Sequence, residues 1–391
     1  MTSTHTKHDA AKSNTELTQL QQDIINNFQK GFPLCSNPYL AIAQKLTVAQ
    51  KLSNNHCALN EENQITELSV FNALLDLDNL GVTSRIGPVF DHKKAGASTL
   101  AALAVDEKDL NKIASIVNQF EQVNHNYARG SHFDKTDYNL WFVVTASDPV
   151  ALNYTLTRIE LLTGLTVLVL PMEASYHLDL AFTINVTGKV SSKVNEEVSL
   201  DAISKNTQPL SEIQPLTEIK KSQLRKLIET GLPKQLQPYE KIAQAINSSA
   251  QQVIVQLTKW QQTGLIRRFG LVVKHRKLGY NANAMVVWNI NSKEVDAVAA
   301  ILAKRAEVSL CYRRPRRLPD WPYNLFCMIH GTDKNRVLQQ IEDITKQLSL
   351  SKIEKDILFS YKAYKQKGAS YLKSSHLKRN YLRNEIGSTH G

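Results

Sequence analysis

The chain has 391 residues, of which 42% are hydrophobic and 21% charged, the balance of a folded protein and not of a disordered one. Lys and Arg outnumber Asp and Glu by 47 to 36, a formal charge of +11, so the expected partners are anionic: nucleic acid, a membrane surface or an acidic small molecule. This length allows several compact domains and excludes a single small module.

Cysteine usage and the chain start indicate the compartment. Cys35, Cys57, Cys311 and Cys327 form no CxxC pair, so neither a structural zinc site nor a disulfide framework is indicated. The polar start MTSTHTKHDAAKS lacks the apolar core of a signal peptide, and no run approaches the ~20 apolar residues of a membrane span. We therefore expect a cytoplasmic protein without membrane association.

The two halves of the chain match each other. PYLAIAQKL in the first half matches PYEKIAQAI at an offset of 200 residues, and GVTSRIGPVFDHKKAG at 81–96 lies over GLIRRFGLVVKHRKLG at 264–279. Further on, 123–148 lies over 308–333 at an offset of 185. Because these anchors keep one order, the chain is interpreted as a tandem duplication.

Each half starts with helical segments and continues with strands. In the second half, SQLRKLIETGLP, PYEKIAQAI and SAQQVIVQLTKWQQTG predict three short helices before a basic β segment, the order of a winged helix-turn-helix. A βαββαβ ferredoxin-like order follows. The first half shows the same order, with its last strand expected within 167–182. The predicted fold class is α+β, a tandem duplication of a winged helix-turn-helix followed by a βαββαβ ferredoxin-like domain.

The polar stretch before the second half, nearly free of aromatic residues, is interpreted as a linker. The expected domains are a disordered tail at 1–14, a winged helix at 15–90, a ferredoxin-like domain at 91–185, the linker at 186–220, a second winged helix at 221–275, a second ferredoxin-like domain at 276–370 and a polar tail at 371–391.

The architecture resembles that of Lrp/AsnC regulators, and longer motifs narrow the resemblance. HNYARGSH with YNLWF, LPMEASYHLDLAF, RRFGLVVKHRKLGYNANAMVVW and CYRRPRRLPDWPYNLFCMIHG are similar to those of the siroheme decarboxylases, an Lrp/AsnC-like family. In that family two Lrp-like subunit types cooperate in the haem d1 route or the alternative haem route. The resemblance therefore implies a fused form, with one subunit type per half.

This resemblance implies an activity and partners. The activity is decarboxylation of siroheme to 12,18-didecarboxysiroheme, in which two acetate side chains become methyl groups, and the fused form favours the haem d1 route. The partners are siroheme and related iron tetrapyrroles. The halves should form an internal pseudo-dimer with their sheets face to face, and further homo-oligomerisation stays open. Decarboxylation needs no oxidant and the chain has no GxxxxGK[ST] motif, so no added cofactor is expected: the iron comes with the substrate, and no metal site is predicted.

Arginines are the expected anion-binding residues, because siroheme carries eight carboxylates and the planar guanidinium grips a carboxylate with two hydrogen bonds. A rigid aromatic segment holds Arg313, Arg314, Arg316 and Arg317 beside Trp321. A solvated basic face is the alternative interpretation of such a run. The other expected substrate-binding residues are Arg85, Arg129, Arg268, Tyr127 and His177.

Histidines are the expected proton donors. Loss of an acetate carboxylate as carbon dioxide leaves electron density on a methylene, and histidine is well suited to deliver the missing proton near neutral pH. His125 and His132 flank Arg129 in one short segment, and the second half has Leu310 and Arg317 at the equivalent positions.

A second histidine pair is duplicated. His92 and His275 occupy equivalent positions just after the two wings. They are alternative catalytic candidates, with structural pairing to a backbone carbonyl equally open. His330 lies inside a predicted strand and is interpreted as a core residue.

Two alternatives belong to other functional classes. A DNA-binding regulator needs a recognition helix that tolerates phosphate, but 64–81 contains Glu67, Asp76 and Asp78 and no Lys or Arg, and 249–263 contains only Lys259. No nucleic-acid partner is therefore expected. A haem sensor without catalysis is the other alternative, and product analysis distinguishes it from an enzyme.

Overall fold

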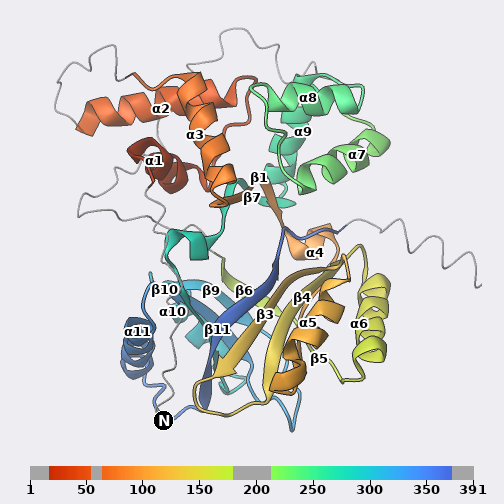
Figure 1. Ribbon diagram of the computed structural model, residues 1–391, viewed down its shortest axis with the longest axis vertical. Helices are drawn as coiled ribbons and strands as arrows, with labels where there is room; N and C mark the ends of the chain where they lie inside the picture. The colour runs from red at the N-terminus through yellow and green to blue at the C-terminus, as the bar shows by residue number, and fades with distance from the viewer. Residues whose placement is uncertain (1–16, 54–63, 179–212, 372–391) are drawn as a thin grey trace, which may run out of the picture.

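The computed structural model describes residues 17–53, 64–178 and 213–371. The expected tail at 1–14, most of the expected linker and the tail after Tyr371 lie outside the described residues. A layer of helices occupies one end of the molecule and β-sheet with flanking helices the other (Figure 1).

Both halves show the same order of elements. The first half contains α1 (Gln19–Phe28), α2 (Pro38–Ser53), α3 (Glu67–Asn79), β1 (Thr83–Phe90), α4 (His92–Ala95), β2 (Ala97–Ala104), η2 (Glu107–Asp109), α5 (Leu110–Asn118), β3 (Val123–Ser131), β4 (Tyr138–Ala146), α6 (Pro149–Thr163), β5 (Leu168–Pro171) and β6 (Ala174–Leu178). The second contains α7 (Glu218–Glu229), α8 (Pro238–Ala245), α9 (Ala250–Gln262), β7 (Ile266–Val273), η5 (His275–Leu278), β8 (Ala282–Trp288), α10 (Val295–Leu302), β9 (Val308–Arg313), β10 (Leu325–Gly331), α11 (Lys334–Gln347) and β11 (Lys355–Gln366). Helix α7 starts inside the stretch expected as linker.

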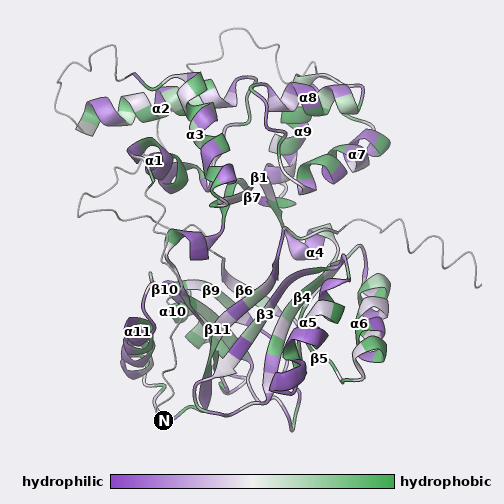
Figure 2. Ribbon diagram, in the orientation of Figure 1, coloured by the Kyte–Doolittle hydropathy of each residue, from purple (hydrophilic) through white to green (hydrophobic). Residues whose placement is uncertain are grey.

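Local sequence explains where the helices start and which face they bury. The Thr66 side chain accepts a hydrogen bond from the Ser69 amide, and the Ser69 side chain accepts one from the Thr66 amide, so this reciprocal cap starts α3. Val70, Leu74 and Leu77 then recur at helical spacing and are buried. The helices accordingly carry both hydrophobic and hydrophilic residues (Figure 2).

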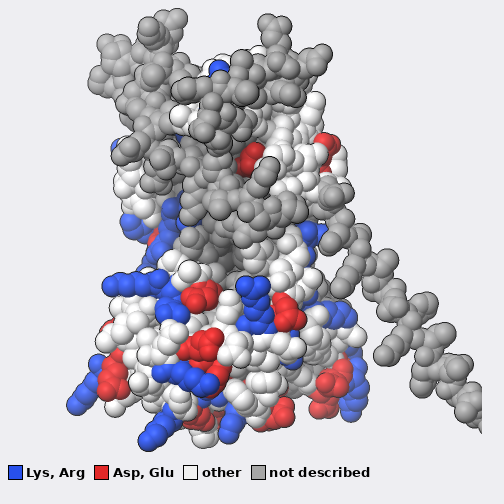
Figure 3. Space-filling model, turned by 90° about the vertical axis from the view of Figure 1, so that its left-hand side faces the viewer, with Lys and Arg blue, Asp and Glu red and all other residues white. Residues whose placement is uncertain are grey.

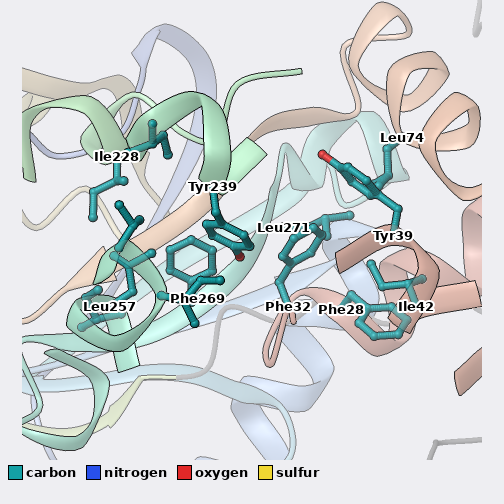
Figure 4. Packing of buried hydrophobic residues seen from close by; sticks show 14 of the residues in the cluster. Phe28, Phe32, Tyr39, Ile42, Leu74, Ile228, Tyr239, Leu257, Phe269 and Leu271 are labelled. Atoms are coloured by element: carbon teal, nitrogen blue, oxygen red, sulfur yellow. The ribbon is translucent and has the colours of Figure 1, made fainter. Parts of the chain in front are cut away.

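The two helical domains share one hydrophobic core. Phe28 and Phe32 of the first half pack in the same cluster as Tyr239, Phe269 and Leu271 of the second (Figure 4). Burying such aromatic side chains stabilises the contact by ~2 kcal/mol each. The helical domains therefore fold against each other and not as independent modules.

Each wing has a single strand, and the strands of the two halves pair with each other. β1 and β7 form an antiparallel ribbon in which Gly87 lies opposite Gly270, its equivalent residue. A Cβ atom on Gly270 would lie 2.3 Å from the carbonyl oxygen of Gln29, so only glycine allows the end of α1 to approach the ribbon this closely. The ribbon passes near the pseudo-twofold axis that relates the halves.

The ferredoxin-like parts also join across the halves. Their strands form one hydrogen-bonded array in the order β5-β2-β4-β3-β11-β8-β10-β9-β6. β11 connects the two parts because it pairs with β8 of its own half and with β3 of the other. Helices α5 and α6 cover the outer face of one part, and α10 and α11 cover the other (Figure 1).

The inner faces of the two sheets pack against each other. Trp141 from β4 and Met285 from β8 belong to one buried cluster, together with Trp321 and Phe326. This contact is the expected face-to-face pseudo-dimer.

The last strand of the first half differs from its prediction. A continuous strand was expected within 167–182, but the strand is interrupted between Pro171 and Ala174, which gives β5 and β6. β5 pairs with β2 in its own half, whereas β6 crosses over and pairs with β9 of the second half. An exchanged edge strand of this kind depends on tertiary pairing, which the local sequence does not reveal.

Within the described residues, no helix has both the length and the apolar character needed to cross a membrane.

Candidate active site

A cavity of about 400 Å³ lies between the two halves, where the β1–β7 ribbon meets the facing sheets. Both halves supply its wall through equivalent positions. The equivalent pairs are Arg85 and Arg268, His92 and His275, Tyr127 and Tyr312, Arg129 and Arg314, and Trp141 and Phe326. Gln366 at the end of β11, with residues 367–369 and Tyr371 after it, closes another part of the wall. The duplication has therefore built a cavity that both halves share.

Two equivalent arginines are fixed in this wall. Arg129 on β3 and Arg314 just after β9 are each only 8% exposed, and each donates a hydrogen bond from Nη1 to a backbone carbonyl, at 3.1 and 2.5 Å. Each guanidinium also lies over the ring of a neighbouring tyrosine, at 5.6 Å from Tyr127 and 5.5 Å from Tyr312. Burial lowers the pKa of both arginines to about 10, and no described carboxylate forms an ion pair with either.

The ribbon contributes two more arginines to the cavity. Arg85 on β1 donates to the Pro88 carbonyl oxygen at 3.0 Å, and its equivalent on β7 is Arg268. Burial and the charge of Arg268 lower the pKa of Arg85 to about 10, against the opposing effect of Glu229. Two like charges are therefore held on one side of the cavity.

Three imidazoles gather at one end of the cavity, here called the His275 end. His125 comes from β3, His275 from η5 and His330 from β10, and the His275 and His330 ring centroids are 5.2 Å apart. Burial, with Arg85 and Arg129, lowers the pKa of His125 to about 4. Burial, with neighbouring cations and histidines, lowers the pKa of His275 to about 4 and that of His330 to about 3. All three are therefore neutral at pH 7 in the protein alone.

The equivalent region around His92, here called the His92 end, has different chemistry. Asp91 caps α4 by accepting hydrogen bonds from the amides of Lys93 and Lys94, and it forms an ion pair with Arg267 at 2.6 Å. Burial is the main cause that lowers the pKa of His92. The position equivalent to His125 is Leu310, which also lines the cavity.

Only one member of the predicted arginine run reaches the cavity, namely Arg314. Arg313 instead forms ion pairs with Glu173 and Asp296, both at 2.9 Å, at the exchanged strand β6. Arg316 donates to Asn289 and Arg317 to the carbonyl oxygen of Val169. β9 ends at Arg313 and the chain then turns, so successive side chains point in different directions.

Three other residues predicted for the site, namely His132, Trp321 and His177, lie outside the cavity wall. His125, Tyr127 and Arg129 alternate along one face of β3, whereas His132 follows the end of this strand and lies beside Phe133 at a separate surface depression. The segment that carries these residues is mostly strand, and the period of two along the strand separates His132 from the others.

Trp321 packs behind the cavity wall, whereas His177 lies away from the cavity. The Trp321 side chain is fully buried and packs on Trp141 and Phe326, at centroid distances of 5.1 and 5.9 Å, so it supports two lining rings without lining the cavity itself. His177 lies on β6 opposite Cys311 and does not line the cavity.

His330 is a cavity residue that the sequence reasoning assigned to the core. Phe326 lies opposite Tyr312 and Met328 opposite Leu310, and directly opposed residues share a face of a sheet. Because Tyr312 is equivalent to Tyr127, this alternation carries on to His330 and could have identified it.

The charge of the cavity contrasts with that of the surface. Figure 3 shows Lys and Arg mixed with Asp and Glu over the β-rich end of the face in view. The cavity wall contains the cations Arg85, Arg129, Arg268, Arg314 and Lys367 and four histidines, and no carboxylate from the described residues. No cluster of three or more possible metal ligands was found within the described ranges. The arrangement can bind a polyanion and place neutral imidazoles against it.

Comparison with known proteins agrees with this architecture. The model of the AsnC-like ligand binding domain matches residues 94–177 and 277–365. The siroheme decarboxylase NirDL subunit of Paracoccus denitrificans is 32% identical over 357 residues, covering 90% of this chain and 98% of that protein. The NirL subunit of Stutzerimonas stutzeri is 48% identical over 156 residues, 40% of this chain and 92% of that protein.

Solved structures show the same fold. The crystal structure of a siroheme decarboxylase NirDL superposes with a TM-score of 0.62 at 23% identity, covering 95% of this chain and 100% of that one. A second structure, of a siroheme decarboxylase NirDL in co-complex with an iron-uroporphyrin III analogue, gives a TM-score of 0.61. The fold class predicted from the sequence is confirmed. On the identity to the Paracoccus protein along most of both chains, this chain belongs to the siroheme decarboxylase family.

Proposed function

We propose that this chain decarboxylates siroheme in the cavity between its halves and converts two acetate side chains to methyl groups, giving 12,18-didecarboxysiroheme for haem d1 synthesis. The observation that carries the proposal is the positive charge of the cavity wall. Five cations and four histidines line the cavity, without a carboxylate from the described residues. The co-complex of a solved siroheme decarboxylase with an iron-uroporphyrin III analogue supports a tetrapyrrole as the occupant.

The arginines bind the carboxylates. Arg129 and Arg314 are buried without an ion-pair partner among the described residues, and a buried charge of this kind is unfavourable until an anion reaches it. Arg85 and Arg268 supply two further cations from the ribbon. The four equivalent positions lie around a pseudo-twofold axis, which suits a macrocycle with carboxylates around its rim.

The histidines at the His275 end provide the protons. As the bond between methylene and carboxylate breaks, carbon dioxide leaves and its bonding electrons remain on the methylene, in conjugation with the macrocycle. A proton from an imidazolium nitrogen of His125 or His275 then completes the methyl group. His132 is not part of this proposal because it lies away from the cavity.

Substrate binding itself prepares these donors. Arg85 and Arg129 help to hold the pKa of His125 low, and Arg276 and Arg129 do so for His275. Carboxylates that pair with the arginines cancel part of this positive field and raise the histidine pKa values. Binding therefore takes up protons at the place where the reaction uses them. The iron is part of the substrate, and we propose no additional cofactor.

Anaerobic incubation with siroheme followed by mass analysis tests the function. The expected product has lost two carbon dioxide units. A bound tetrapyrrole of unchanged mass would instead identify a non-catalytic sensor, and failure to bind siroheme in a spectroscopic titration would refute both functions.

A further inference from the structure

Ser309 on β9 makes two short contacts on the neighbouring strand. Its Oγ lies 2.9 Å from the carbonyl oxygen of Met328 and 2.8 Å from Nδ1 of His330. A serine hydroxyl has one proton, and a carbonyl oxygen can only accept. Ser309 therefore donates to Met328 and accepts from Nδ1–H of His330, and Nε2 of this neutral imidazole is an acceptor.

His330, whose tautomer Ser309 sets, lies next to His275, a proposed proton donor. The His330 and His275 rings meet edge to face, with centroids 5.2 Å apart at 63°. The other titratable and charged groups that act on the two rings are His125 and Arg129 of β3 and Arg276 of η5. A neutral ring that carries an acceptor nitrogen and packs against His275 favours the form of His275 that carries two ring protons.

The first half contains the same pair of positions without the titratable group. At the offset of 185 residues, Ser309 corresponds to Asn124 and His330 to Thr145. Asn124 donates to Thr145 Oγ1 at 3.1 Å, and Thr145 donates to the carbonyl oxygen of Ser370. Both halves thus keep a cross-strand hydrogen bond here, but only the second half uses it to orient an imidazole.

We propose that Ser309 is a positioning residue for decarboxylation, which holds His330 as the Nδ1–H tautomer and thereby stabilises the proton-donating form of His275. This inference rests on the proposed function, because it needs His275 to deliver a proton. Ser309 acts through His330 and does not touch the reacting atoms.

The tautomer is measurable without turnover. In protein labelled with ¹⁵N-histidine, the His330 signals are those lost in His330→Asn, and we expect Nδ1 to carry the proton in the native chain. Ser309→Ala should shift His330 toward the Nε2–H tautomer, whereas Asn124→Ala, which removes the equivalent bond in the first half, should leave His330 unchanged. A native His330 protonated at Nε2 overturns the proposal, whether or not Ser309→Ala folds.

Kinetics supply the second readout. Ser309→Ala should lower kcat by about 10–100-fold, less than the loss typical for removing a general acid, with the Kd for siroheme unchanged. Ser309→Thr keeps the hydroxyl and should restore kcat, and Asn124→Ala should retain it. Native kcat in Ser309→Ala refutes the positioning role. If the native chain releases no carbon dioxide, the proposed function fails, while the tautomer measurement still reports on Ser309.

Discussion

The two ends of the cavity are made from equivalent positions but have different chemistry. Both ends have an arginine on or just after a strand, a tyrosine and a histidine after the wing, and the ribbon adds one arginine from each half. The His275 end adds His125 and His330, where the equivalent positions hold Leu310 and Thr145. After duplication, the cation positions were kept in both halves, whereas the additional imidazoles are concentrated at one end.

This difference separates binding from proton transfer. A macrocycle with carboxylates around its rim gains from cations on all sides, so both halves benefit from the same arginines. A proton is needed only where a carboxylate leaves, and there an additional imidazole at one end suffices for one acetate at a time. The two roles can therefore be tested by comparing equivalent substitutions at the two ends.

The largest contrast should come from the histidines. His275→Gln or His125→Gln should reduce turnover by a factor of about 10²–10⁴ with siroheme affinity nearly unchanged, because the arginines still hold the carboxylates. The matched change His92→Gln at the other end should cost less, and His132→Gln, outside the cavity, should have no effect. Single-turnover carbon dioxide release measures all four, and a greater loss in His92→Gln would move the proton chemistry to the His92 end.

The arginines should behave symmetrically. Arg129→Ala and Arg314→Ala should each weaken siroheme binding by about 1.5–3 kcal/mol, because each removes a charge-assisted contact from a buried position. Arg317→Ala is the control, since its side chain contacts a backbone carbonyl away from the cavity. Spectroscopic titration measures the three affinities. A strong loss in only one of the two equivalent variants would show that binding has also diverged.

Stability should depend on pH through the His275 end. The pKa of His275 is lowered from 6.5 to about 4, so the unfolded chain takes up the proton first as the pH falls. Stability contributed by the neutral ring is present above pH 6.5 and is lost between about pH 6.5 and pH 4, which amounts to about 2 kcal/mol at pH 5. Urea unfolding at pH 7 and pH 5 should therefore show a smaller loss in His275→Gln than in the native chain. Equal losses would contradict this assignment.

The repeat and the strand alternation decided how much of this site the sequence could predict. The repeat predicted Arg85 with Arg268 and His92 with His275 as pairs, and all four line the cavity. The same residue type at equivalent positions of the two halves can be recognised without knowing the local structure. His132 was grouped with His125 from proximity along the chain, whereas the period of two of a strand decides which side chains share a face, and His132 lies outside the cavity wall. The exchange of β6 lay beyond prediction, since it depends on pairing with a distant strand.

The smallest predicted effect concerns the position that most directly distinguishes the two ends. Leu310→His places an imidazole opposite Met328, at the position equivalent to His125, and leaves the arginines in place. If the native chain supplies protons from one end, the macrocycle must reposition between its two decarboxylations, so the monodecarboxylated intermediate should accumulate during turnover. The added histidine should lower this accumulation about two- to threefold, an effect far below the typical 10²–10⁴ of general acid catalysis because the native donors still operate. The masses of the products over a time course measure it. Leu310→Gln is the matched control, since it has a polar group without a titratable proton, and an equal effect in both variants would attribute the change to cavity polarity and not to proton supply.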